Sequence, residues 1–239
     1  MLRLLLGGLL LAASPLCAQT LASGGADKLL IVGNYATVEI TTSPDGTIRY
    51  EHSVTVNGQP VPDIGEITSE RSGGTLTLRE SQPTSETIGE LCRDARNKRY
   101  RENCNSRIRL RVAVPAGLWV EVETVYGAVE ATDQAGLARV HSTYGALEVV
   151  YDDVAPPAEL DLYGNYGEVD LSLPADVAAE VELVTQYGSL LTDFDIAIDA
   201  AASEQRAFYE RVVGTLGAGG GTRVTCRSPY DTVYLRRSE

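Results

Sequence analysis

Histidine is nearly absent from this sequence, with only His52 and His141 among 239 residues. His141 is followed by Ser142, but neighbouring side chains of a strand point to opposite faces, so these two cannot form a nucleophile–base pair. We interpret both histidines as surface residues. With so few bases available, we predict that the protein is not an enzyme.

Long apolar runs are also missing, apart from residues 4–13 near the start of the chain. A positive charge, this short run and the small residue Ala18 are typical of a secretory signal peptide, which we place at residues 1–18. The run is too short to cross a bilayer as a helix, so the processed chain is not expected to be transmembrane. Cys17 lacks the small preceding residues of lipoprotein signals, which disfavours lipid anchoring. We therefore expect an exported protein of the periplasm or the cell surface.

Basic residues are scarce, at 20 against 33 acidic ones. Removal of residues 1–18 takes away one basic residue, Arg3, and changes the net charge from −13 to −14. This balance argues against nucleic acid as a partner. A basic inserted loop at 88–107 reverses the sign locally, either as a solvated loop or as a docking site for an anionic partner. Its basic residues are Arg93, Arg96, Lys98, Arg99, Arg101 and Arg107.

Cysteine is infrequent, with three cysteines after the signal peptide. Cys92 and Cys104 flank the basic loop, and export permits a disulfide between them, which we predict. The alternative is two reduced thiols in a surface loop. No C-x-x-C pair or nearby histidine accompanies them, so the spacing does not indicate a metal site. Cys226 is expected to be a small buried apolar residue.

Against these absences stands one abundant feature, a repeated Tyr-Gly step followed by an alternating strand. The spacings between successive steps are 18, 22 and 21 residues. Two degenerate copies occur at Tyr35-Ala36 and Tyr230-Asp231. The four complete steps are Tyr126-Gly127, Tyr144-Gly145, Tyr166-Gly167 and Tyr187-Gly188.

Apolar residues recur at fixed offsets from each tyrosine. Four positions before it stand Ile31, Val122, Val140, Leu162, Leu183 and Cys226. Each unit is therefore a period-two strand, a corner and a second period-two strand. Stacking successive units buries their apolar faces, which predicts an all-β, single-stranded β-helix or β-solenoid. We expect the glycines to supply positive φ at the corners and the tyrosines to form a stacked ladder.

The remaining boundaries follow from where the repeat weakens. Residues 19–27 are expected to be flexible, and residues 28–237 to form the β-solenoid domain. The segment 199–221 breaks the alternation and is predicted to be irregular, a short helix or an ordered loop. The glycine-rich stretch at its end is interpreted as the turn into the last coil. Arg236 and Arg237 are expected to protect an exposed sheet edge.

Outward-facing charges form two predicted columns. Glu130, Glu148 and Asp170 occupy equivalent positions in successive units, with Glu168 nearby. We predict that these carboxylates are either a calcium site or a screened acidic face; no other cofactor is expected. Arg139 falls between Glu121 and Asp161, which indicates a charge ladder that stabilises the stack.

The segments "VAVPAGLWVEVETVYGAVEAT", "LSLPADVAAEVELVTQYGSLLTDF" and "GAGGGTRVTCRSPYDTVYLRR" resemble a bacterial β-strand-repeat family of unknown function. This family is labelled "putative adhesin" and is also called the toastrack domain. The resemblance covers roughly residues 27–237, and Asp231 departs from its closing Tyr-Gly pair. It implies a β-helix-like domain of the cell envelope, without known catalysis and without binding residues that can be transferred.

Three functions compete at this point. The first is a non-enzymatic envelope or surface module that acts as a scaffold or in signalling, with an envelope protein as partner. The second is a carbohydrate- or calcium-dependent adhesin that binds a surface glycan through exposed Tyr163, Tyr234 and Trp119. The third is a carbohydrate-active β-helix enzyme, which would need a cleft with carboxylates and a base.

Overall fold

The structure is a computed structural model that describes residues 19–21, 25–61, 65–81, 89–90, 92–93 and 104–238. The predicted signal peptide at 1–18 and most of the basic loop at 88–107 lie outside the described residues. Within the described part of the chain, no helix has the length and apolar character needed to cross a membrane.

The chain is all-β, as predicted, and forms two mixed sheets. The first sheet contains β1 (Gln19–Leu21), β4 (Ile48–Val56), β8 (Ser106–Val114), β3 (Thr37–Thr42), β10 (Val129–Thr132), β12 (Leu147–Val150), β14 (Val169–Leu173), β21 (Val233–Arg237) and β16 (Leu190–Thr192) in that order, with β5 (Gln59–Pro60) beside β4. The second sheet contains β17 (Ala197–Ile198), β19 (Tyr209–Leu216), β15 (Ala179–Thr185), β20 (Thr222–Ser228), β13 (Glu159–Gly164), β11 (Leu137–Ser142), β9 (Trp119–Thr124), β2 (Lys28–Val32), β7 (Thr75–Glu80) and β6 (Ile67–Ser72) in that order, with β18 (Glu204–Arg206) beside β19.

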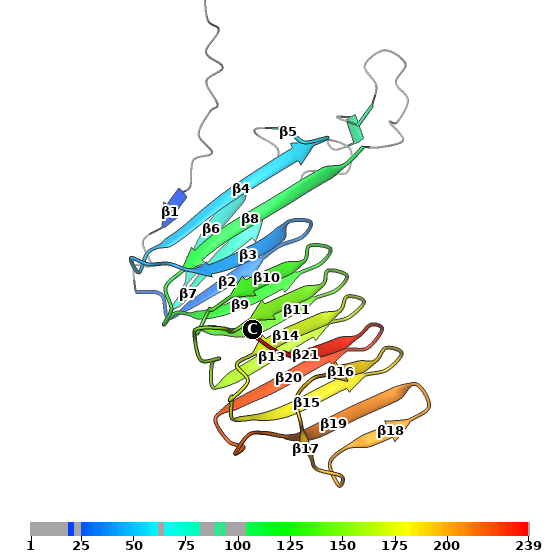
Figure 1. The fold of residues 1–239 in the computed structure, drawn as a ribbon. Coiled ribbons are helices and arrows are strands. Elements are labelled where there is room, and N and C mark those ends of the chain that lie inside the picture. Colours follow the sequence, from blue (N-terminus) through cyan, green and yellow to red (C-terminus); the bar gives the residue numbers. More distant parts are fainter. Residues whose placement is uncertain are drawn as a thin grey trace, which may run out of the picture.

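Each repeat unit gives one strand to each sheet, and the units lie one above the other (Figure 1). Equivalent strands pair in parallel, as β9 does with β11 and β10 does with β12. Among the described strands, antiparallel pairs lie toward the two ends, where β4 follows β8 and β19 follows β15. The middle of each sheet is therefore built from the repeat, and its ends from hairpins.

The spatial order of the units differs from their order in the sequence, which corrects the expectation of successive stacking. The last unit, β20 with β21, lies between the β13–β14 unit and the β15–β16 unit. Strand β21 therefore lies inside the first sheet. Arg236 and Arg237 extend past the end of β16 and pair only with β14, and protection of an edge by these two arginines stays a prediction. At the other end, β7 and β8 lie outside β2 and β3.

The inserted last unit is made possible by the segment 199–221, which was predicted to be irregular. It contains β18 and β19, and β19 takes the free edge of β15 by antiparallel pairing. The chain then crosses the start of β15 to pair with its other edge as β20. A Cβ on Gly221, whose φ is +70°, would lie 2.4 Å from the Ala178 carbonyl oxygen. Only glycine fits this crossing.

The interior residues form one continuous file, as their shared offset from the tyrosines predicts. Backbone register places each residue of the file next to its neighbour in the adjacent unit, and all are almost fully buried. The order is Ile31, Val122, Val140, Leu162, Cys226 and Leu183. Cys226 is a free, buried thiol, and burial raises its pKa, so it is inert packing material.

The corner glycines are required for close approach and not for positive φ, which corrects the sequence-based explanation. None of Gly127, Gly145, Gly167 or Gly188 has φ in the left-handed region. Instead, a Cβ on Gly145 would lie 2.0 Å from the carbonyl oxygen of Gly127 in the adjacent unit. The equivalent distance at Gly167 is 2.2 Å, to the carbonyl oxygen of Gly145. The corners therefore stack backbone on backbone, with no room for a methyl group.

Two features near the irregular N-terminal region complete the fold. Residues 19–21, within the segment expected to be flexible, form strand β1, which pairs antiparallel with β4. Cys92 and Cys104 form a disulfide, which confirms that prediction.

Candidate functional site

The most extensive candidate surface is a row of stacked tyrosines at the corners, here called the tyrosine ladder. Neighbouring rings lie 4.7–5.3 Å apart and within 17° of parallel. Each tyrosine residue is 40–58% exposed, so the ladder forms a ridge along one side of the molecule. In spatial order its members are Tyr35, Tyr126, Tyr144, Tyr166, Tyr230 and Tyr187.

Stacking determines which part of each ring a partner can reach. The two faces of an inner ring such as Tyr144 are covered by its neighbours, and only the edge with its hydroxyl remains exposed. The inner rings can therefore donate and accept hydrogen bonds and present apolar edges, but they cannot stack on a ligand. A free ring face is available only at an end of the ladder.

The aromatic platforms expected from the sequence are mostly covered. The Arg227 guanidinium lies over the ring of half-buried Tyr163, and the Arg236 guanidinium lies 4.3 Å from the ring centroid of Tyr234. Trp119 remains 47% exposed, and its Nε1 donates a hydrogen bond to Glu121. Of the three predicted platforms, Trp119 is the most open.

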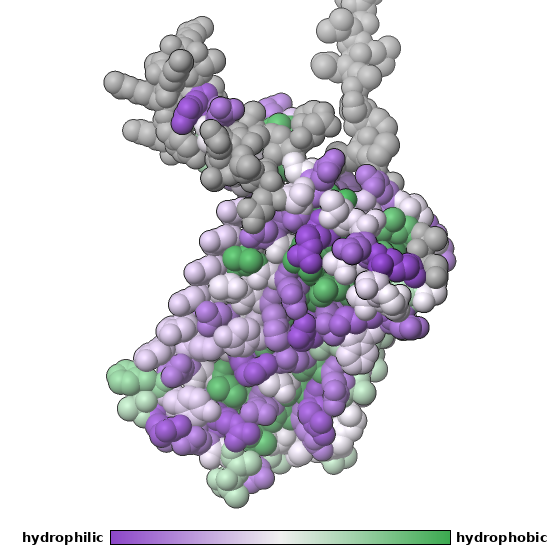
Figure 2. Space-filling model, turned by 180° about the vertical axis from the view of Figure 1, so that it is seen from behind, coloured by the Kyte–Doolittle hydropathy of each residue, from purple (hydrophilic) through white to green (hydrophobic). Residues whose placement is uncertain are grey.

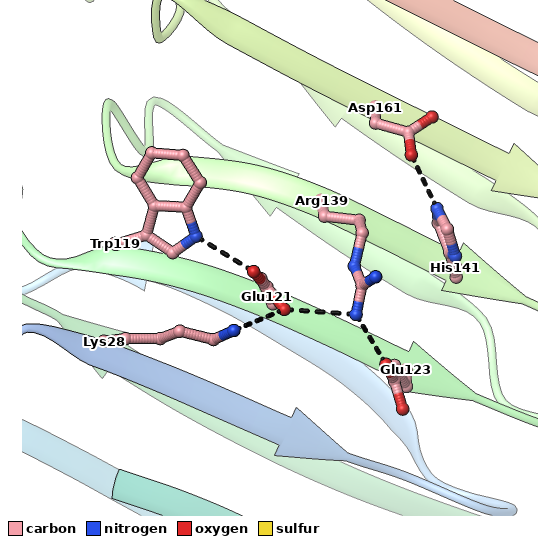
Figure 3. Close-up of polar contacts among 7 residues, drawn as sticks. All are labelled: Lys28, Trp119, Glu121, Glu123, Arg139, His141 and Asp161. Atoms are coloured by element: carbon pink, nitrogen blue, oxygen red, sulfur yellow. Dashed lines mark hydrogen bonds and ion pairs between the residues drawn. The ribbon is translucent and has the colours of Figure 1, made fainter. Parts of the chain in front are cut away.

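The outer face of the second sheet carries a network of paired charges (Figure 3). Glu121 Oε2 lies 2.7 Å from Lys28 Nζ and 3.1 Å from an Arg139 nitrogen, and Arg139 also lies 2.7 Å from Glu123. The predicted ladder around Arg139 thus exists, but its second acidic partner is Glu123 and not Asp161. The carboxylates in this network already have cationic partners, so we interpret them as groups that stabilise the sheet through cross-strand ion pairs.

Asp161 belongs to a neighbouring group on the same face. Its two carboxylate oxygens accept hydrogen bonds from His141 at 2.9 Å and Arg227 at 2.7 Å. Burial raises the pKa of Asp161, but these hydrogen bonds outweigh burial and leave the pKa below its usual value. His141 is therefore a partner of a carboxylate on the sheet surface, and no nucleophile faces it in this group.

The acidic column lies on the outer face of the first sheet. Register places Glu130 between Glu39 and Glu148, and Glu148 next to Asp170. Both ends are neutralised: Glu39 contacts Arg109 and Arg111, and Arg236 donates to both oxygens of Asp170 at 2.9 Å. The exposed residue Glu168 precedes β14. Among the described residues, no group of three or more histidines, cysteines or carboxylates is arranged to hold a metal. Calcium binding by Glu130, Glu148, Glu168 and Asp170 stays a prediction.

A buried polar group that the sequence did not point to lies at the first corner. Glu80 Oε2 accepts hydrogen bonds from the backbone N–H groups of Asn34, Tyr35 and Ala36, at 2.6, 3.0 and 3.1 Å. At the later corners, such N–H groups donate to carbonyls of the adjacent corner, as Tyr144 N does to Val125 O. Glu80 replaces the missing adjacent corner, because β7 and β8 are joined by the insertion and not by a Tyr-Gly step.

His52 lies near Glu80 on β4, at an inward-facing position. Its Nε2 is buried and has no hydrogen-bond partner among the described residues. Burial lowers the pKa of His52 below its ordinary value of 6.5, partly offset by the charge of Glu80. His52 is therefore a half-buried residue with an enclosed Nε2, and the expected surface position holds only in part.

This burial predicts that the free energy of unfolding decreases as the pH falls below 6.5. In that range the unfolded chain protonates His52 before the folded chain does, so protons favour unfolding until the lowered folded-state pKa is passed. Urea unfolding on both sides of pH 6.5 should show the decrease in the wild type and a smaller one in His52→Gln. Equal pH dependence in the two proteins would contradict this assignment.

Comparisons with known proteins bear on the fold. No protein-family model matches the chain, and no curated protein matches it. Among solved structures, the chain is similar to a "putative cell adhesion protein" from Clostridium sporogenes ATCC 15579, with a TM-score of 0.59 and 12% identity over 92% of this chain and 98% of that chain. A "putative adhesin" from Bacteroides fragilis NCTC 9343 covers 95% of this chain and 98% of its own at 12% identity, but its TM-score of 0.29 carries no argument.

The description of the first neighbour matches the "putative adhesin" label of the family that the sequence resembles. At 12% identity this similarity concerns the fold. The use of the surfaces described above must be argued from their own chemistry.

Proposed function

We propose that this protein is an exported, non-enzymatic module of the cell envelope or cell surface, in which a solenoid-like stack presents an extended face to a partner. The observation that carries the proposal is the tyrosine ladder. A ridge of six tyrosines about 5 Å apart, each 40–58% exposed, presents a row of ring edges and hydroxyls to solvent. Exposed contiguous surface of this kind marks an interaction site.

Two further features support this proposal. The Cys92–Cys104 disulfide suits an oxidising compartment outside the cytoplasm. The charged groups that resemble catalytic pairs, such as His141 with Asp161, lie on an open sheet face and are occupied with each other. An acid–base enzyme would instead require free groups that converge on a substrate.

Export is tested in cells that make the protein naturally. We expect a mature chain that lacks residues 1–18, located in the periplasm or at the surface. Cys92 and Cys104 should react with a maleimide only after reduction, because they form a disulfide. A cytoplasmic, full-length protein with both thiols free would contradict the proposal.

The interaction is tested by adding the labelled protein to isolated envelopes from the same cells. We expect saturable binding that weakens about tenfold when Tyr126, Tyr144 and Tyr166 are all replaced by phenylalanine. These changes keep the stacked rings and remove only the exposed hydroxyls. Tyr151→Phe is the matched control, because the Tyr151 hydroxyl is buried and donates to Gln134 O. No saturable binding, or equal loss in both variants, would argue against a role for the ladder.

A further inference from the structure

At one end of the tyrosine ladder, the last ring contacts a phenylalanine and not another stacked tyrosine. Its last ring, Tyr187, faces Phe208 in the two-residue loop that joins β18 to β19. These rings lie 5.9 Å apart at 36°, whereas rings within the ladder stay within 17° of parallel. Tyr187 and Phe208 therefore form a tilted pair, here called the wedge. Rings 5.9 Å apart leave no room for a further ring between them, so a ligand can reach only the exposed surface of Phe208 and the parts of both rings that line the pocket beside the pair.

The position of Phe208 is energetically unfavourable in two ways, because its ring is exposed and its backbone is strained. It is 74% exposed, so its ring gains little from burial. Its φ of +62° lies in the left-handed region, where a bulky side chain is an outlier and glycine or asparagine would fit without strain. Stability explains neither the exposure nor the strained backbone. Backbone strain of this kind is concentrated at binding and catalytic sites.

A shallow pocket of about 250 Å³ opens between the Tyr187 corner and the β18–β19 hairpin. Tyr187 and Phe208 give it apolar walls, and Gln186, Gln205 and Glu210 line it as well. The side chains of these three polar residues have no hydrogen-bond partner among the described residues. Figure 2 shows apolar patches among hydrophilic residues at this end of the molecule. The volume is below the roughly 300 Å³ at which sites for drug-sized ligands begin, so it suits one small ring.

The charges around the pocket select against an anionic ligand. Arg206 forms an ion pair with Glu204 at 2.7 Å, and its guanidinium covers the ring of Tyr209 at 5.0 Å. The cation is therefore already neutralised. The carboxylate of Glu210 would repel an anion, while the amides of Gln186 and Gln205 bind neutral hydroxyls well.

We propose that the Tyr187–Phe208 wedge binds a single uncharged pyranose ring, as found at the end of a surface glycan. The C–H face of the sugar packs on the exposed surface of Phe208 and on the part of Tyr187 that lines the pocket, and its hydroxyls bond to Gln186, Gln205 and Glu210. This inference deepens the proposed function, because it names the class of partner at one end of the interaction ridge.

The test uses saturation-transfer difference NMR with the full exported chain and four probes: the methyl glycosides of glucose, galactose, mannose and N-acetylglucosamine. At least one should bind at millimolar concentration. Phe208→Gly should weaken that binding by at least about tenfold, because it removes one wall of the wedge. The same variant relieves the left-handed strain, so its unfolding midpoint in urea should not fall below that of the wild type.

Trp119→Ala is the matched control, because Trp119 is also an exposed aromatic residue but lies on another unit; binding should be unchanged. The proposal is overturned if no probe binds, if Phe208→Gly binds as the wild type does, or if Trp119→Ala alone abolishes binding. None of these results affects the export and envelope-binding tests, so a failure of this inference is distinguishable from a failure of the proposed function.

Discussion

Replacing Gly145 by alanine should lower the free energy of unfolding by about 3 kcal/mol or more. The new methyl carbon would lie 2.0 Å from the carbonyl oxygen and 2.4 Å from the carbonyl carbon of Gly127, and backbone atoms cannot rotate away. Relief requires the two corners to separate. That separation would stretch the hydrogen bond from Tyr144 N to Val125 O and the ring contact between Tyr126 and Tyr144. Equilibrium unfolding in urea, followed by circular dichroism, measures the loss.

The matched control for this substitution is Gly117→Ala. Gly117 also lacks a positive φ, but a Cβ there meets no atom within 4 Å. Its unfolding free energy should stay within about 0.5 kcal/mol of the wild type. Equal, small effects at Gly145 and Gly117 would show that the corners are not stacked as tightly as described.

Replacing Glu80 by alanine should also destabilise the fold by about 3 kcal/mol or more, since three backbone N–H groups lose their acceptor at once. These groups belong to the first corner, which has no adjacent corner to supply carbonyls. The loss should be local at first. Hydrogen exchange at Asn34, Tyr35 and Ala36 should therefore accelerate more than exchange in the middle of the stack. Urea unfolding and exchange measured by NMR give both results.

Two controls separate the role of Glu80 from that of any carboxylate nearby. Glu70→Ala removes an exposed acid from β6 and should change the unfolding free energy by less than about 0.5 kcal/mol. Glu80→Gln keeps one acceptor oxygen without the charge and should give an intermediate loss. An alanine variant as stable as the wild type would mean that water or another group accepts these hydrogen bonds.

The interior file was predictable from sequence, because its members share one offset from a recurrent tyrosine. Strand alternation places Val122, Val140 and Leu162 on the same face, and backbone register then aligns them. The ladder follows from the same logic. Such predictions succeed because each unit repeats both the period-two pattern and the corner.

The spatial order of the units was not predictable from the repeat. Because every unit carries the same columns, Cys226 fits beside Leu162 or beyond Leu183 equally well. The order is decided outside the repeat, by the antiparallel pairing of β19 with β15. That strand occupies the edge of β15 at which the last unit would otherwise have added.

The sequence analysis missed two residues, buried Glu80 and exposed Phe208, although each left a signal. Glu80 follows Leu76 and Leu78 at a spacing of two residues, so its side chain lies on the buried face of β7. A buried carboxylate needs hydrogen-bond partners. Phe208 is one of only two phenylalanines and stands in a polar segment. Its contact with Tyr187 depends on the placement of the hairpin, which no local pattern specifies.

For the corner glycines, the sequence correctly predicted tight corners, but the reason we gave for glycine, a positive φ, was wrong. Their recurrence indicated a tight corner, and positive φ is the usual reason for glycine there. Contact between neighbouring units demands glycine just as strongly, and a single unit viewed alone does not reveal it. Ala36 is tolerated at the first corner because Glu80 takes the place of an adjacent corner.

The most direct test of the stacked, reordered units is the set of side-chain nuclear Overhauser effects around Cys226. The structure predicts contacts from Cys226 to Leu162 on one side and to Leu183 on the other, with no direct contact between the two leucines. Direct contacts between Leu162 and Leu183, with Cys226 next to only one of them, would contradict the account.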